Sequence, residues 1–84
     1  MEEKEIGIVT HYFGKISVGI VQLKNELKVG DTIRIRRVHD DFTQVVDSMQ
    51  IEHKQVEKAG KGEMVGIKLA NKVHPNDRVF LVAQ

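Results

Sequence analysis

The sequence contains no cysteine and no tryptophan, and its only proline is Pro75. Without cysteine the chain forms neither a disulfide nor a thiolate metal site, which excludes the usual way in which small secreted domains are stabilised. One tyrosine and three phenylalanines supply little aromatic bulk. We therefore expect valine and isoleucine to fill most of the core of one small domain over residues 1–84, with residues 1–5 as a frayed tail.

The chain also lacks an excess of charge of one sign and any long apolar run. Thirteen Lys and Arg stand against twelve Asp and Glu, so an electrostatic site has to be a local patch. No apolar run approaches the roughly 18 residues that cross a bilayer. The acidic start over residues 1–5 does not have the basic and then apolar pattern of a secretory signal. We expect a soluble, cytoplasmic protein with no membrane partner.

Motifs for catalysis, metal binding and nucleotide binding are absent as well. There is no cysteine nucleophile, no G-x-S-x-G elbow and no phosphate-binding G-x-x-x-x-G-K-[ST] loop. The four histidines lie on four different segments without close ligand spacing: His11, His39, His53 and His74. We expect no enzyme activity, no cofactor, no metal and no nucleotide, so that any function depends on a binding surface.

The stretch 27–36 carries the clearest local signal. Gly30 and Asp31 form a turn dipeptide, since glycine adopts positive φ without steric cost and aspartate hydrogen-bonds nearby backbone. After this turn Ile33 and Ile35 alternate with polar residues, which predicts a half-buried strand.

Several more short apolar runs, separated by turn signals, predict further strands. In the second run Ile16, Val18 and Ile20 share one parity, while Val21 and Leu23 share the other. The charged segment 53–63 is expected to connect two strands, and a short helical turn over 55–61 competes there. Strands at this spacing indicate an all-β fold, a small closed antiparallel Greek-key barrel of six to seven strands. The expected strands are 6–13, 16–23, 32–38, 42–52, 64–69 and 78–82.

Four motifs in order resemble the second domain of the translational GTPases, the β-barrel of elongation factor Tu and its relatives. The Leu-Lys-Val-Gly-Asp turn is the clearest of them, and the others match a first hairpin, a later strand and an A-x-x-G-x-x-V-G signature. The matching segments are 14–21, 27–31, 46–50 and 56–67.

This resemblance implies a noncatalytic barrel that binds RNA or the ribosome, through ribosomal or transfer RNA, without a GTPase domain. Similar barrels occur as accessory domains on RNA-modifying proteins of the collagenase-like peptidase family. In elongation factor Tu an arginine after the V-G strand contacts the aminoacylated end of transfer RNA. The matching residue here is Ala70, so that contact is not implied.

Two groups of residues are the first candidates for RNA binding. The lysines of the 54–72 region could position phosphates, or they could simply keep a loop soluble. At the predicted barrel rim Tyr12 and Phe13 could stack a base while Lys15 contacts its phosphate, although one aromatic ring could instead plug the barrel end. The lysines are Lys54, Lys58, Lys61, Lys68 and Lys72.

Arginines of the strand after the 27–31 turn are a third candidate. Arg34 and Arg36 alternate onto its outer face, with Arg37 near the end, and a guanidinium group suits phosphate oxygens. The alternative is a solvated face in which these arginines pair with Asp40, Asp41 or Asp47.

A different function remains open beside RNA binding. The chain could be a protein–protein adaptor or a homodimer, because the translation-factor barrel packs on a partner domain. Val21 and Leu23, on the parity opposite to Ile16, would then form the exposed apolar patch.

Overall fold

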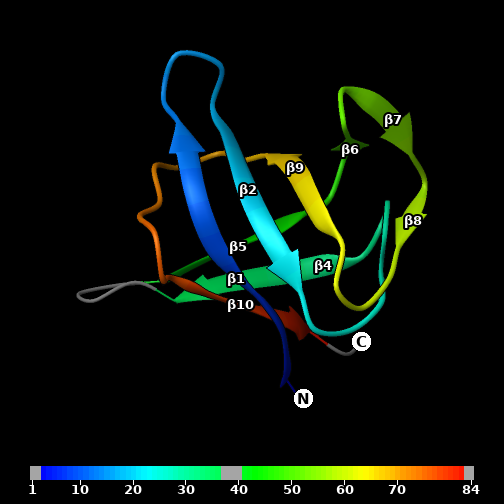
Figure 1. Cartoon of the computed structure of the whole chain (residues 1–84). Coiled ribbons are helices and arrows are strands. Elements are labelled where there is room, and N and C mark those ends of the chain that lie inside the picture. The colour runs from blue at the N-terminus through cyan, green and yellow to red at the C-terminus, as the bar shows by residue number, and fades with distance from the viewer. Residues whose placement is uncertain (1–2, 37–40, 83–84) are drawn as a thin grey trace.

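The computed structural model describes residues 3–36 and 41–82, and every element among them is a β-strand (Figure 1). Turns and short loops join the strands, and no helix occurs in these two ranges. The all-β prediction is therefore confirmed. The strands are β1 (Glu3–Phe13), β2 (Val18–Leu23), β3 (Leu27–Lys28), β4 (Thr32–Arg36), β5 (Asp41–Val45), β6 (Met49–Ile51), β7 (Lys54–Val56), β8 (Lys58–Ala59), β9 (Met64–Lys68) and β10 (Arg78–Val82).

Eight of these strands form one antiparallel sheet in the order β5-β4-β10-β1-β2-β9-β6-β7, and β3 pairs with β8 separately. The sheet curls, so that β4, β5 and β10 run across β1 and β2 (Figure 1). Apolar side chains fill the space inside the curl, among them Ile33, Val21 and Ile67, all without solvent exposure. One core therefore holds together strands that are far apart in the sequence.

The 27–31 turn has the predicted conformation. Gly30 adopts a φ of 96°, and the backbone amide of Lys28 donates to Asp31 Oδ2 at 2.9 Å. In β4 the side chains of Ile33 and Ile35 are buried, while the end of the predicted strand at 37–38 lies outside the described residues. The predicted turn and half-buried strand are confirmed over the described part.

The inner face of β2 is the reverse of the one suggested by the sequence. Val21 and Leu23 are buried in the core, so they cannot form the exposed patch that was expected from them. Ile16 is 61% exposed and lies in the turn before β2, and Val18 and Ile20 are only partly buried. Because residues of both parities are apolar here, periodicity alone does not decide which face is inside.

The predicted strand 42–52 is two strands, β5 and β6, because Val46 leaves the ladder. The Val46 amide donates to the Asp31 carbonyl, and the Gly30 amide donates to the Val46 carbonyl, both at 2.8 Å. The 27–31 turn therefore draws Val46 into the core. The charged segment that follows contains β7 and β8, with Glu52 and His53 at positive φ in the tight β6–β7 turn, so the helical alternative is wrong.

Closure into a barrel is not confirmed. In the described ranges β5 and β7 are the two edges of the eight-stranded sheet, and no ladder joins them. One side chain crosses from β5 to the end of β9: Gln44 Nε2 donates to the Lys68 carbonyl at 2.9 Å, and its Oε1 accepts from the Ala70 amide at 2.8 Å. We call this contact the Gln44 seam.

Candidate interaction surface

The outer surface of the curled sheet has two halves of different character. On β1, β10, β4 and β5 it is covered by charged side chains that contact one another, and we call this region the ion-paired half. Part of it lies on residues 3–5, which belong to β1 and pair with β10 instead of fraying as expected. Its members are Glu3, Glu5, Lys24, Arg34, Arg36, Asp41 and Arg78.

Arg34 and Arg36 share the carboxylate of Glu3. Arg34 also lies 3.8 Å from Asp41 through its Nε, and Arg36 lies 3.8 Å from Glu3 while its guanidinium stands 4.7 Å over the ring of Phe80. These contacts favour a solvated, paired strand face over a phosphate site. Of the partners considered, Asp41 is used, and Asp40 lies outside the described residues.

Glu5 is the one group in this half with a resolved change in acidity. The hydrogen bond from Lys24 lowers the pKa of the Glu5 carboxyl below its ordinary value of 4.5, burial opposes this shift, and the charges of Lys24 and Arg78 add to it. A lowered pKa stabilises the fold above pH 4.5, and that contribution is lost as the pH falls through the folded-state pKa.

We expect Lys24→Gln to raise the pKa of Glu5 toward 4.5, because the strongest stabiliser of its charged form is removed. The side-chain carboxyl carbon of Glu5, followed by NMR across an acid titration, measures this change. Lys54→Gln is the matched control, since Lys54 lies on β7, an edge strand that pairs with β6 and not with β1. An unchanged Glu5 titration in the Lys24 variant would contradict the assigned cause.

The other half of the outer surface is nearly uncharged. Neighbouring strands place its side chains in three rows: Phe13, Val18 and Lys68; then His11, Ile20 and Gly66, with Gln50 beside them; then Ile8, Gln22 and Met64. Their neighbours along each strand point into the core. We call these ten residues the apolar face. Phe13 and Met64 are each 48% exposed.

Gly66 lies in the middle of the apolar face and shapes it. A methyl group on Gly66 would lie 3.3 Å from Val18 Cγ1 and 3.5 Å from Ile20 Cδ1. The side chains of β2 therefore lean over the β9 backbone. At the hairpin end the rings of His11 and Phe13 meet edge to face with centroids 6.3 Å apart. The surface is low in relief at Gly66 and bounded by an aromatic corner.

Sequence reasoning missed the apolar face as a surface. Phe13 and Lys68 are predicted RNA contacts, but the exposed apolar patch is predicted at Val21 and Leu23, on the parity opposite to that of Val18 and Ile20. The sequence Val-Gly-Ile-Val-Gln-Leu of β2 could have indicated this surface, because both of its faces are apolar except at Gln22.

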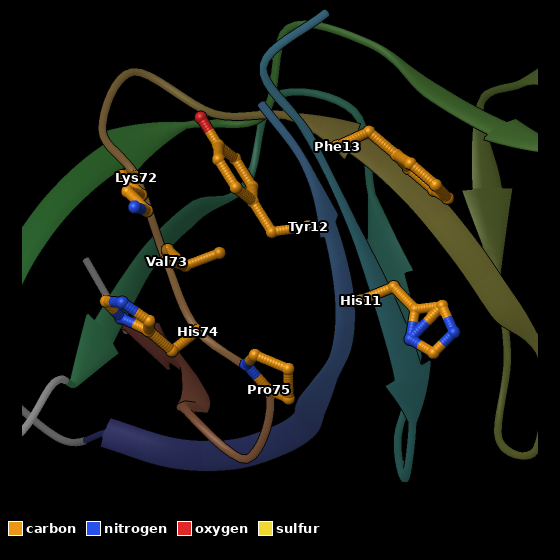
Figure 2. A pocket seen from close by; sticks show the side chains of 7 residues that line it. All are labelled: His11, Tyr12, Phe13, Lys72, Val73, His74 and Pro75. Carbon is orange, nitrogen blue, oxygen red and sulfur yellow. The ribbon is translucent and has the colours of Figure 1, made fainter. Parts of the chain in front are cut away.

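The predicted aromatic pair points to opposite sides of β1. Tyr12 packs against the core, while the side chains of His11 and Phe13 leave β1 on the other side (Figure 2). All three residues line a hollow of about 380 Å³, together with Lys72, Val73, His74 and Pro75. Tyr12 therefore belongs to the core side of β1, which agrees with the alternative that one of the two aromatic rings is a packing residue. Lys15 lies exposed in the turn after Phe13.

The five candidate lysines do not gather at one place. Lys54 and Lys58 lie on β7 and β8, and Lys61 follows in the turn after β8, whereas Lys72 lies in the loop before β10 on the far side of β2 and β9 (Figure 1). Lys68 lies on the apolar face. This separation removes the dense basic patch on which phosphate binding was predicted to depend.

Metal-binding clusters and membrane-spanning helices are both absent from residues 3–36 and 41–82. No group of three or more His, Cys, Asp or Glu side chains there could hold a metal ion. The same ranges contain no helix that is long and apolar enough to cross a membrane. The buried carboxylate of Asp77 accepts from the His74 amide at 2.8 Å and so stabilises the turn before β10.

Comparison with known proteins identifies the fold. The chain superposes on the C-terminal domain of a putative U32 peptidase from Geobacillus thermoleovorans with a TM-score of 0.89, over 95% of this chain and 93% of that domain, at 20% identity. The chain has the fold of that domain. A selenomethionine variant of the same domain matches with a TM-score of 0.86, over 90% of this chain and 96% of that chain, at 22% identity.

A sequence relative points in the same direction. The chain is 47% identical over 81 residues to a protein of Methanocaldococcus jannaschii described as an uncharacterized protease. The match covers 95% of this chain and 20% of that protein, so the chain spans about a fifth of the length of its relative. No protein-family model matches the chain.

These matches correct three predictions. The assignment to the translation-factor second domain is wrong, because the sequence relative is named a protease and the solved structures are U32 peptidase domains. The prediction of an RNA- or ribosome-binding module depended on that assignment and is therefore wrong as well. The expectation of no enzyme activity is also contradicted, because the M. jannaschii relative is named a protease.

Proposed function

We propose that this chain works as an accessory β domain of a protease-type protein, in the role that the matched region has in the M. jannaschii relative. The observation that carries the proposal is the 47% identity over 95% of the chain with a segment of that protein. The matched segment is 20% of that protein, so the larger part of the relative lies outside the region that this chain resembles.

A chimera tests this function. The matched region of the M. jannaschii relative is replaced by this chain, and hydrolysis of fluorescein-labelled casein is compared with that of the intact relative. Since the two sequences agree at nearly half of their aligned positions, we expect the chimera to retain hydrolysis within about tenfold of the intact protein, a loss of about 1.4 kcal/mol or less in transition-state stabilisation.

The control is the same protein with an unrelated β domain of similar size at that position. Because only domain identity differs, this control should hydrolyse casein no faster than a version that lacks the region. A chimera that behaves like this control would contradict the proposed function.

Two finer expectations remain proposals of the same kind. We infer that the curled sheet acts as a closed barrel in solution, and the Gln44 seam between β5 and the end of β9 supports this. We also infer a cytoplasmic location, which the complete lack of cysteine supports because reducing compartments make no use of disulfides.

A further inference from the structure

We propose that the apolar face is the surface through which this domain docks onto the body of a protease-type protein. The partner surface is apolar, with an acidic group opposite Lys68. The inference rests on the proposed function and names the surface that serves it. Three features of the chain carry it: the composition of β2, the distribution of charge and the size of the face.

The composition of β2 is close to that of a strand covered on both sides. Strands with one solvated face alternate apolar and polar residues, whereas strands buried on both faces are apolar throughout. In β2 the inward side chains of Val21 and Leu23 meet the core. On the outward side Val18 and Ile20 are also apolar, and Gln22 is the one polar residue. The core covers the first pair, and the docking partner would cover the second.

The distribution of charge separates this face from the rest of the surface. Charged residues make up 30% of the chain, yet Lys68 is the only Lys, Arg, Asp or Glu among the ten residues of the apolar face. Depletion of charge is typical of the centre of protein interfaces. The ion-paired half, in contrast, has the composition of a surface that remains in water.

The size of the face favours a tethered partner over a second copy of the chain. Stable interfaces between free proteins use about 20–30 residues on each side, and the apolar face has ten. A domain joined to its partner needs less contact area, because the tether supplies a high effective concentration. The M. jannaschii relative, of which the chain matches only 20%, has such additional chain.

Site-specific labelling tests the proposal, and the lack of native cysteine makes the chain well suited to it. Gln22→Cys places a thiol on the apolar face, and Thr43→Cys on β5 is the matched control away from it. The labelling rate with a maleimide is read by mass spectrometry of the labelled peptide. Each variant is measured in the isolated chain and in the chimera with the M. jannaschii relative.

We expect Gln22→Cys to react at least about tenfold more slowly in the chimera than in the isolated chain, since docking shields the thiol. Thr43→Cys should react at about the same rate in both. Adding Ile20→Lys to the chimera should restore fast labelling of Gln22→Cys, because a charge is then buried against an apolar partner. Circular dichroism of the Ile20→Lys chain verifies that its fold is unchanged.

Equal labelling of Gln22→Cys in both contexts would overturn the docking face. If the chimera still hydrolyses casein in that case, the proposed function stands and only the surface is wrong. If Gln22→Cys is protected but hydrolysis is lost, the proposed function fails instead. Protection already in the isolated chain, together with a dimer in sedimentation velocity, would assign the face to a second copy and overturn the proposal.

Discussion

Gly7→Ala is expected to lower the free energy of unfolding by about 2–3 kcal/mol, as overpacking of a dense interior does. A methyl group at Gly7 would lie 2.7 Å from the carbonyl oxygen of Gln22 and 2.7 Å from Val21 Cγ1. The first of these is a backbone atom in the adjacent strand β2, so the clash cannot be relieved by a rotamer change. Relief requires β1 and β2 to separate at the centre of the sheet.

Two other glycines serve as comparisons for the loss of stability expected at Gly7. At Gly19 an added methyl group would meet Leu69 Cδ1 at 2.6 Å, and because that atom ends a flexible side chain, Gly19→Ala should cost less than Gly7→Ala. At Gly14 the nearest atom is Tyr12 Cε2 at 3.7 Å, an ordinary contact, so Gly14→Ala should be neutral or stabilising by up to about 1 kcal/mol. Urea unfolding followed by circular dichroism gives all three values. A Gly7→Ala chain as stable as Gly14→Ala would show that β1 and β2 are not packed this closely.

Ile67→Ala is expected to destabilise the domain by about 2–5 kcal/mol, through lost transfer free energy and the cavity left behind. Ile67 has no solvent exposure, and its backbone pairs with β2 on one side and β6 on the other. The substitution therefore affects the strand that links β2 to β6 within the sheet. Small domains have unfolding free energies of about 5–15 kcal/mol, so this is a large part of the total.

Met64→Ala is the matched control on the same strand. Met64 lies on β9 three residues before Ile67 and faces outward with 48% exposure. We expect its replacement to change the free energy of unfolding by about 0.5 kcal/mol or less, as is usual at exposed positions. Thermal and urea unfolding of both variants measure the difference. Similar losses at the two positions would show that the inner and outer faces of β9 have been assigned incorrectly.

Elements with a strong local signal were predicted well from the sequence. The 27–31 turn needs a positive φ at Gly30 and a nearby carboxylate at Asp31, and both requirements are met by adjacent residues. Alternation in β4 then identifies Ile33 and Ile35 as core residues. The turn and the burial pattern of β4 depend on residues that are close in the sequence, so a stretch of ten residues is enough to predict them.

Features that depend on distant partners were not predictable in the same way. β7 and β8 are short and mostly polar, and β8 exists because Lys58 and Ala59 pair with β3 about thirty residues earlier. Arg34 forms an ion pair with Glu3 in addition to the aspartate nearby in the sequence. The two residues are brought together by the strand order β4-β10-β1, which the sequence pattern does not reveal. The parity of β2 was ambiguous because both of its faces are apolar, and the apolar face was missed for the same reason.

The Gln44 seam implies an order of events when the domain opens. Hydrogen bonds from the side chain of Gln44 join β5 to the end of β9, whereas backbone ladders join β1, β2 and β9. Local opening follows the weakest connection, so β5 can separate from β9 while the rest of the sheet stays folded. β5 is an edge strand of the sheet, and Val45 at its end is 48% exposed. An unpaired strand edge is a template for pairing between chains, so we expect the Gln44 seam to limit such pairing at the edge of β5.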